Sequence, residues 1–317
     1  MERRGLQLDS ITMGVVEVGA GVGRPLLILL HGFPETADSW RHQVQPLADS
    51  GFHVVAPDQR GFGATSAPDD VADYSMLHLV GDVVSLIGAL GASEAVVVGH
   101  DWGAPVAWNT ALLRPDLVRG VVGMSVPFLP PGPVDILTAL DLTVGPHHYQ
   151  RWFQGDAATE ELDADPRRGL LAFYGALSGH DGDPHDLVLG EGRSLLDALP
   201  AVDEPPPWMT DEHLDHLVES FTASGFRGGL NWYRTAVINQ PLLRPWTGKL
   251  LEVPAAFITG DLDVVHRWPG MSDAEALLPA FAPRLVRSEV LEGCGHWTAE
   301  ERPDEVTAFL LDVLAAL

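Results

Sequence analysis

At 317 residues with 46% hydrophobic content, the chain is long enough for a large α/β core that carries an insertion. Acidic residues outnumber basic ones by 44 to 19, and a net charge of −25 should repel phosphate backbones and anionic lipid, which argues against nucleic acid and membrane surfaces as partners. The single cysteine, Cys294, excludes an intrachain disulfide framework and a cysteine-rich metal site, and it fits a reducing compartment.

Strands and helices are predicted to alternate through the first part of the chain. Residues 1–23 contain no signal peptide, and no span approaches the length of a membrane helix, so we expect a soluble cytoplasmic protein. The alternation favours a mostly parallel sheet with helices on both faces. Glycine and proline mark the transitions between an edge strand at 11–18, a buried strand at 25–30, a helix at 39–48, strands at 52–56, 95–98 and 118–126, and a helix at 75–90.

The pattern changes after residue 128. From 129 to about 252, strands are hard to find and proline-rich stretches interrupt short helical segments, which indicates a mostly helical inserted lid. We therefore expect an α/β core made of residues 1–128 and 253–317, with residues 129–252 as the lid. The returning core pattern comprises a strand at 254–259, a helix near 272–281, a strand at 285–291 and a terminal helix from Pro303.

The stretch Gly99-His100-Asp101-Trp102-Gly103 joins the predicted strand at 95–98 to a helix that begins near Ala104. Small residues two positions to either side of Asp101 allow a sharp turn that holds one strained side chain above a sheet. A carboxylate in this position predicts a nucleophile that forms an ester, so the attacked atom is an sp³ carbon bearing a leaving group. The alternative is an ordinary turn with aspartate near a helix N-cap.

An aspartate ester needs a base that activates water and an acid that orients the base. His296, in a glycine-rich turn after the strand at 285–291, is the candidate base. Asp263 follows another strand end and is the candidate acid, with Asp261 as its rival and turn capping as the other role open to both. The chain order of nucleophile, acid and histidine is that of the α/β-hydrolase fold.

Backbone N–H groups at Phe33 and Trp102 are candidates for an oxyanion hole. Phe33 lies in His31-Gly32-Phe33-Pro34, which ends the strand at 25–30 opposite the aspartate turn. Such a pair of donors stabilises the oxyanion formed when water attacks the ester carbonyl. A plain strand-ending turn is the alternative for this segment.

Together these motifs resemble a soluble epoxide hydrolase of the α/β-hydrolase fold. The resemblance spans nearly the whole chain and includes two lid segments, residues 148–154 and 224–234, that are similar to those carrying the family's lid tyrosines. It implies Asp101 as nucleophile, His296 as base, Asp263 as orienting acid, and Tyr149 and Tyr233 as the pair that activates the epoxide. A phenol stays protonated at neutral pH and can donate to an alkoxide. No metal or organic cofactor is required.

Other signals receive simpler interpretations. Trp102, Trp152 and Trp297 are candidates to line an apolar substrate pocket, with packing of the lid on the core as the alternative. His213 and His216 are three residues apart on a predicted helix, and we expect a solvated helix face there. Cys294 is expected to be a small buried side chain.

The sequence therefore predicts an epoxide hydrolase that converts an epoxide and water into a vicinal diol. The enzymatic alternative is a haloalkane or haloacid dehalogenase, which uses the same aspartate ester but needs N–H donors for a halide. A non-catalytic ligand-binding module is the alternative from another class. The only expected partner is a small-molecule epoxide, a homodimer is kept open, and the sequence does not indicate which epoxide is used.

Overall fold

The computed structural model describes residues 2–180, 182 and 185–317 of the chain. These residues build an eight-stranded sheet in the order β1-β2-β4-β3-β5-β6-β7-β8. β2 pairs antiparallel with β1 and β4, and the pairs from β4 to β8 are parallel, as predicted for the core. The strands are β1 Glu2–Gln7, β2 Thr12–Val18, β3 Leu26–Leu30, β4 His53–Pro57, β5 Ala95–His100, β6 Val118–Met124, β7 Ala255–Gly260 and β8 Leu285–Leu291.

The edge position predicted for residues 11–18 is wrong. β2 lies inside the sheet, because β1 pairs along its outer side, with Glu2 opposite Glu17 and Gln7 opposite Thr12. β1 itself is exposed at five of its six residues, so it carries no apolar pattern from which a strand could be predicted.

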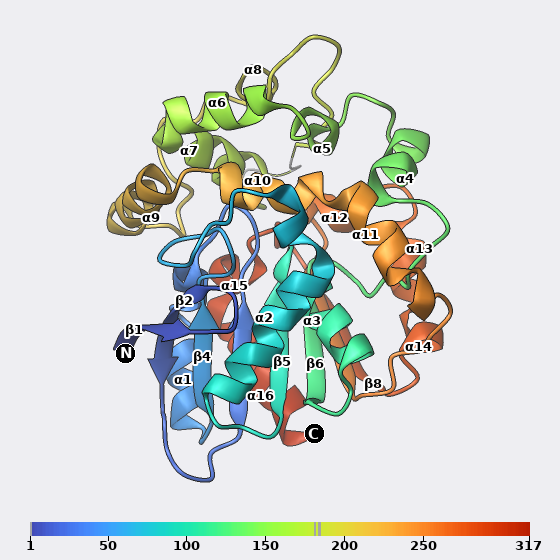
Figure 1. Cartoon of the computed structure of the whole chain (residues 1–317). Coiled ribbons are helices and arrows are strands. Elements are labelled where there is room, and N and C mark those ends of the chain that lie inside the picture. Colours follow the sequence, from blue (N-terminus) through green and yellow to red (C-terminus); the bar gives the residue numbers. More distant parts are fainter. Residues whose placement is uncertain (1, 181, 183–184) are drawn as a thin grey trace.

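Alternation along the central strands sends side chains into two hydrophobic cores. In β3 every residue is buried; Ile28 and Leu30 belong to the core on one face, and Leu27 and Leu29 to the core on the other. The first core contains residues of α2 and α3, and the second contains residues of α1 and α16. The helices therefore cover both faces of the sheet, as Figure 1 shows.

Two helices predicted in the core are interrupted. The one expected over 39–48 forms η1 and α1, and the one expected over 272–281 divides into α13 and α14, where Pro279 lies in the first turn of the second piece. The core helices are η1 Ala37–Trp40, α1 Val44–Asp49, η2 Val71–Tyr74, α2 Met76–Ala89, α3 Gly103–Leu113, α12 Val264–Arg267, α13 Met271–Ala276, α14 Leu278–Phe281, α15 Thr298–Glu301 and α16 Pro303–Ala315.

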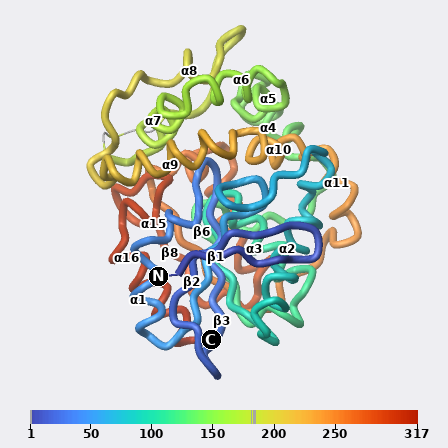
Figure 2. Tube along the Cα trace, turned by 60° about the vertical axis from the view of Figure 1, so that its left-hand side comes forward, coloured from blue at the N-terminus to red at the C-terminus, as the bar shows by residue number. Residues whose placement is uncertain are grey.

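A helical insertion connects β6 to β7 and lies across one end of the sheet in both views of the chain (Figures 1 and 2). Its helices are α4 Ile136–Thr143, α5 Tyr149–Trp152, α6 Asp156–Ala164, α7 Pro166–Ala176, α8 Leu195–Ala198, α9 Asp211–Ser224, α10 Arg227–Arg234, α11 Ala236–Leu243 and η3 Arg244–Trp246. None of the helices in the described part of the chain has the length and hydropathy needed to cross a membrane.

Candidate active site

Asp101 lies between the end of β5 and the start of α3. Its φ of 48° is in the left-handed region, which few residues with a side chain adopt. The turn is this tight because its flanking residues lack side chains. A Cβ on Gly99 would lie 2.0 Å from the Gly103 carbonyl oxygen, and a Cβ on Gly103 would lie 2.3 Å from that of Leu30. The backbone thereby presents the Asp101 carboxylate at the carboxyl end of the central strands.

The two candidate oxyanion donors follow neighbouring parallel strands. Phe33 comes after β3, and its N–H donates a hydrogen bond to Asp101 Oδ1 at 2.8 Å. Trp102 occupies the N-cap position of α3, so its N–H lies at the positive end of the helix dipole. Pairing of β3 with β5 therefore brings both residues to the same edge of the sheet.

His296 lies between two carboxylates. Its Nδ1 is 2.9 Å from Asp263 Oδ1, and its Nε2 is 3.4 Å from Asp101 Oδ2. The three side chains are 4%, 0% and 13% exposed, respectively. Asp261, the rival acid, instead accepts the Gly293 N–H at 2.7 Å. Of the two aspartates after β7, Asp263 is thus the one that contacts the imidazole.

Charge sets the protonation of these three groups. Burial lowers the pKa of His296. The charge of Asp263 and the hydrogen bonds to both aspartates outweigh burial, so the pKa lies well above its ordinary value. Burial raises the pKa of Asp101, yet the hydrogen bond and charge of His296 leave it below its ordinary value. Burial also raises the pKa of Asp263, but the charge and hydrogen bond of His296 outweigh burial and leave that pKa below its ordinary value. The two carboxylates thus favour the protonated form of His296, and His296 favours the ionised form of each carboxylate.

Tyr149 of α5 and Tyr233 of α10 come from the insertion and are 8% and 3% exposed. Their ring centroids are 5.8 Å apart, and the Tyr233 ring is 5.1 Å from the Trp102 ring in an edge-to-face contact. Burial raises the pKa of both phenols, and the negative charge of Asp101 adds to this effect. Both hydroxyls therefore stay protonated at neutral pH beside the carboxylate.

The sequence and fold are similar to those of known proteins. A family model described as alpha/beta hydrolase fold matches residues 25–303. The chain is 40% identical over 313 residues to epoxide hydrolase A of Mycobacterium tuberculosis, and the match covers 98% of this chain and 96% of that protein. It belongs to the epoxide hydrolases of the α/β-hydrolase fold.

Solved structures of other epoxide hydrolases are similar over nearly their whole length. Epoxide hydrolase A from Mycobacterium thermoresistibile is 39% identical, with a TM-score of 0.91 and coverage of 99% of this chain and 98% of that one. Potato epoxide hydrolase I, from Solanum tuberosum, is 34% identical, with a TM-score of 0.89 and coverage of 100% and 99%.

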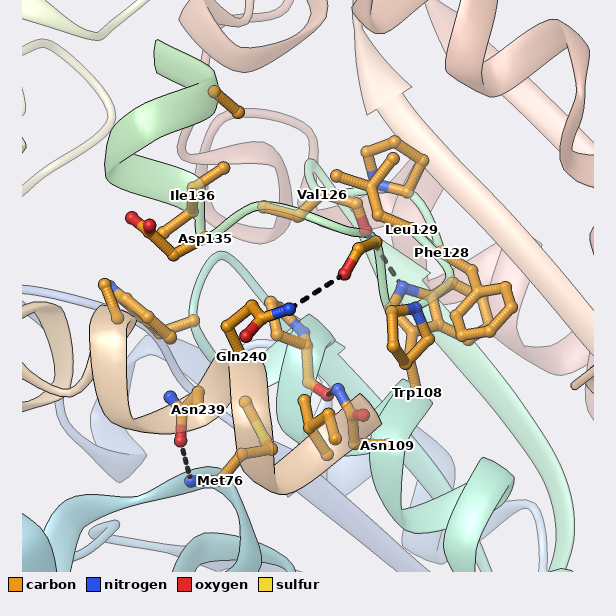
Figure 3. Close-up of a pocket in the computed structure, with 18 of the residues that line it drawn as sticks. Met76, Trp108, Asn109, Val126, Phe128, Leu129, Asp135, Ile136, Asn239 and Gln240 are labelled. Carbon is orange, nitrogen blue, oxygen red and sulfur yellow. Dashed lines mark hydrogen bonds between the residues drawn. The ribbon is translucent and has the colours of Figure 1, made fainter. Parts of the chain in front are cut away.

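A cavity of about 420 Å³ in this epoxide hydrolase is lined by Asp101, Trp102 and Tyr149 together with residues of α3, α4, α11 and the 126–132 segment. Figure 3 shows part of this lining, including Asn109, Asp135 and Gln240. Trp152 and Trp297 are not among the described residues that line it. Trp297 is fully buried, and its indole N–H donates to the Tyr174 carbonyl at 3.2 Å. The structure thus places Trp297 behind the site as a packing residue, and Trp152 against Phe153.

Sequence reasoning gave no role to two buried groups that support the hydrolase site. Glu35 accepts the Gly32 N–H at 2.6 Å and contacts His100 Nδ1 at 2.8 Å. His100 Nε2 in turn lies 2.7 Å from the His296 carbonyl oxygen. A carboxylate directly after the His31-Gly32-Phe33-Pro34 motif was the available signal, because a buried acid needs a partner.

Contacts with the insertion hold the loop that carries His296. The backbone N–H of His296 donates a hydrogen bond to the Leu177 carbonyl at 2.9 Å. The Glu301 carboxylate accepts the N–H groups of Gly179, in the insertion, and of Gly295, in the loop, each at 3.0 Å. The His296 loop is therefore positioned jointly by core and insertion.

The solvated helix face predicted for His213 and His216 of α9 is wrong for His213, which is 8% exposed. It lies 3.1 Å from Arg41 Nη1, and Arg41 forms a 2.8 Å ion pair with the buried Glu300. His216 lies 2.7 Å from Asp38. His213 is covered because Arg41 packs against it, whereas the His216 side chain stays 49% exposed.

Proposed function

We propose that this epoxide hydrolase opens its substrate through a covalent ester on Asp101 and then hydrolyses that ester with water. The observation that carries the proposal is the joint placement of a strained carboxylate, a buried imidazole held by a second carboxylate, and two buried phenols. Each group supplies one part of the chemistry, and the backbone N–H groups of Phe33 and Trp102 supply the oxyanion donors.

In the first step an Asp101 oxygen attacks an epoxide carbon, and the carbon–oxygen bond of the ring breaks with its electron pair going to oxygen. The hydroxyls of Tyr149 and Tyr233 hydrogen-bond to that oxygen, and one of them transfers a proton to it. The proton is replaced from the His296 imidazolium. A protonated phenol is suited to this role because the buried site keeps its pKa high.

Ester formation removes the negative charge of Asp101 and with it one cause of the high pKa of His296. The imidazole, having lost its proton, then takes one from water, while Asp263 holds Nδ1. The resulting hydroxide attacks the ester carbonyl, and the Phe33 and Trp102 N–H groups stabilise the oxyanion. Collapse breaks the bond to the substrate oxygen, which takes the proton of the added hydroxyl group, so that the diol leaves and the Asp101 carboxylate is restored. One proton is consumed in the first step and one is returned in the second, so the cycle closes.

The test is to trap the ester. A His296→Gln variant should react once with styrene oxide and gain the mass of one substrate molecule, located by peptide mapping on the segment containing Asp101. Asp101→Ala is the matched control and should gain no mass. Steady diol production by His296→Gln at the wild-type rate, or a mass gain on another segment, would overturn the proposal. Halide release from chloroalkanes faster than diol formation would instead favour a dehalogenase.

We further infer that residues 129–252 act as the lid on a core formed by residues 1–128 and 253–317. The support is that Tyr149 and Tyr233 come from this insertion, whereas Asp101, Asp263 and His296 come from the core. A cytoplasmic location also belongs to the proposal, and a homodimer stays open; size-exclusion chromatography with light scattering determines the assembly.

A further inference from the structure

The described lining of the cavity beside Asp101 contains acidic side chains but no basic ones. Among the described residues that line it, Asp101 and Asp135 carry carboxylates, and none is a lysine, arginine or histidine. The remaining lining is apolar side chains, proline, glycine, neutral amides and the Tyr149 phenol. A substrate carboxylate bound away from Asp101 would meet the charge of Asp135 with no basic side chain among the described lining residues to offset it.

Asp135 is ionised at neutral pH. Its Oδ1 accepts the Thr138 N–H at 3.0 Å, and its Oδ2 accepts the Thr138 hydroxyl at 2.8 Å, which caps α4. Burial raises the pKa of Asp135, but these hydrogen bonds lower it more. The wall formed by the start of α4 is therefore negative when the enzyme works.

Two amides on the wall leave acceptors available. Asn109 Nδ2 donates to the Pro105 carbonyl at 2.8 Å, and Gln240 Nε2 donates to the Pro133 carbonyl at 3.2 Å (Figure 3). Within the described residues, neither Asn109 Oδ1 nor Gln240 Oε1 accepts a hydrogen bond, whereas Asn239 has partners for both of its amide atoms. The free oxygens can accept a hydrogen bond from a substrate hydroxyl, whereas an anion could bind these amides only through a neutral N–H, without charge compensation.

These acceptors lie away from the nucleophile. Asn109 is six residues along α3 from Gly103, which corresponds to about 9 Å along the helix axis. Gln240 lies on α11, which borders the same cavity (Figure 3). A substrate with its epoxide at Asp101 therefore reaches the amides only through an apolar chain of medium length.

We infer that the preferred substrates are neutral epoxides with an apolar chain that ends in a hydroxyl group, and that epoxides ending in a carboxylate are disfavoured. The inference rests on the proposed function, because it assumes that the epoxide lies against Asp101. The hydroxyl donates to Asn109 Oδ1 or Gln240 Oε1, while a carboxylate in the same place meets only neutral amide donors, no basic side chain of the described lining, and the negative charge of Asp135.

The test compares two terminal alkyl epoxides of identical medium chain length, one ending in a primary alcohol and one in a carboxylic acid, at neutral pH. We expect kcat/KM for the alcohol to exceed that for the acid by at least about tenfold. Equal values would overturn the inference and leave epoxide hydrolysis intact. Absence of diol from either compound and from styrene oxide would instead refute the proposed function.

Charge variants locate the effect on the cavity wall. Gln240→Arg should raise kcat/KM for the acid and reduce the alcohol preference by about fivefold or more. Val237→Arg is the matched control, because it adds the same charge to α11 at a position that is 62% exposed and does not belong to the described lining. An equal gain in both variants would indicate a general effect of net charge and would refute the assignment to the wall.

Two further variants separate the roles of the anion and the amides. Asp135→Asn preserves an N-cap residue for α4 and should raise kcat/KM for the acid about threefold. Asn109→Leu should reduce the ratio of kcat/KM between the alcohol and the unsubstituted alkyl epoxide by about threefold to tenfold. An unchanged ratio in Asn109→Leu would exclude hydrogen bonding at that amide.

Discussion

Removal of the phenol hydroxyls tests how this site opens the ring. Tyr149→Phe and Tyr233→Phe each delete one donor while preserving the ring contacts of 5.8 Å between the two side chains and 5.1 Å to Trp102. A hydrogen bond to a charged oxygen is worth about 1.5–3 kcal/mol, which corresponds to about a 10- to 150-fold loss of ring-opening rate for each single variant. Because both tyrosines are buried, we expect the loss of ring-opening rate in each variant to lie toward the upper end of this range.

The double variant should lose about 10³-fold or more, since no donor then remains for the alkoxide. The assay is single-turnover kinetics of ester formation in a His296→Gln background, which isolates ring opening from hydrolysis. Tyr74→Phe is the control: it removes a buried phenol hydroxyl bonded to the Pro68 carbonyl at 2.8 Å and should not change the rate. Wild-type alkylation by the double variant would refute phenol catalysis.

Three other perturbations have defined outcomes. Asp263→Asn should slow ester hydrolysis by about 10²- to 10⁴-fold in burst kinetics, because the His296 imidazole loses the carboxylate that orients it. An unchanged rate would exclude Asp263 as the orienting acid. Arg41→Ala should lower the free energy of unfolding by about 2–3 kcal/mol at neutral pH, because Glu300 remains buried. The pKa of Glu300 is lowered in the fold, where Arg41 and the α9 imidazole outweigh burial, so its stabilising contribution is present above its ordinary pKa and fades as pH falls. The difference from wild type in denaturant titrations should therefore shrink at acid pH, and a constant difference would contradict this explanation. Gly99→Ala should impair both folding and activity, whereas Gly88→Ala in α2, with no atom within 4 Å of the added Cβ, should be neutral or stabilising by thermal denaturation.

The parallel core was predictable because its strands are buried on both faces and read as continuous apolar runs. β5 and β7 were located to within two residues of their observed ends. The tight turn at Asp101 was also predictable. Gly99 and Gly103 flank it, and a residue with a side chain at either position would clash with the backbone. These features depend on local sequence.

What could not be predicted depends on partners distant in the chain. β1 has an exposed pattern and becomes a strand only through pairing with β2. The face of α9 that carries His213 was recognisable, but Arg41, which covers it, lies 172 residues away. Asp261 and Asp263 follow the same strand, and only the position of the His296 loop distinguishes them. Burial of Trp297 likewise depends on Tyr174 of the insertion.

The bonds from Leu177 and Gly179 to the His296 loop limit how a substrate can enter. If the insertion swung away as one rigid flap, it would break the Leu177 bond to His296 and the Glu301 bridge to Gly179, and the base would lose its position at each opening. Leu129 and Val134, between β6 and α4, line the cavity and are 41% and 47% exposed. A substrate that enters past these two residues leaves the bonds to the His296 loop intact, so the residues at this opening can vary without displacing His296.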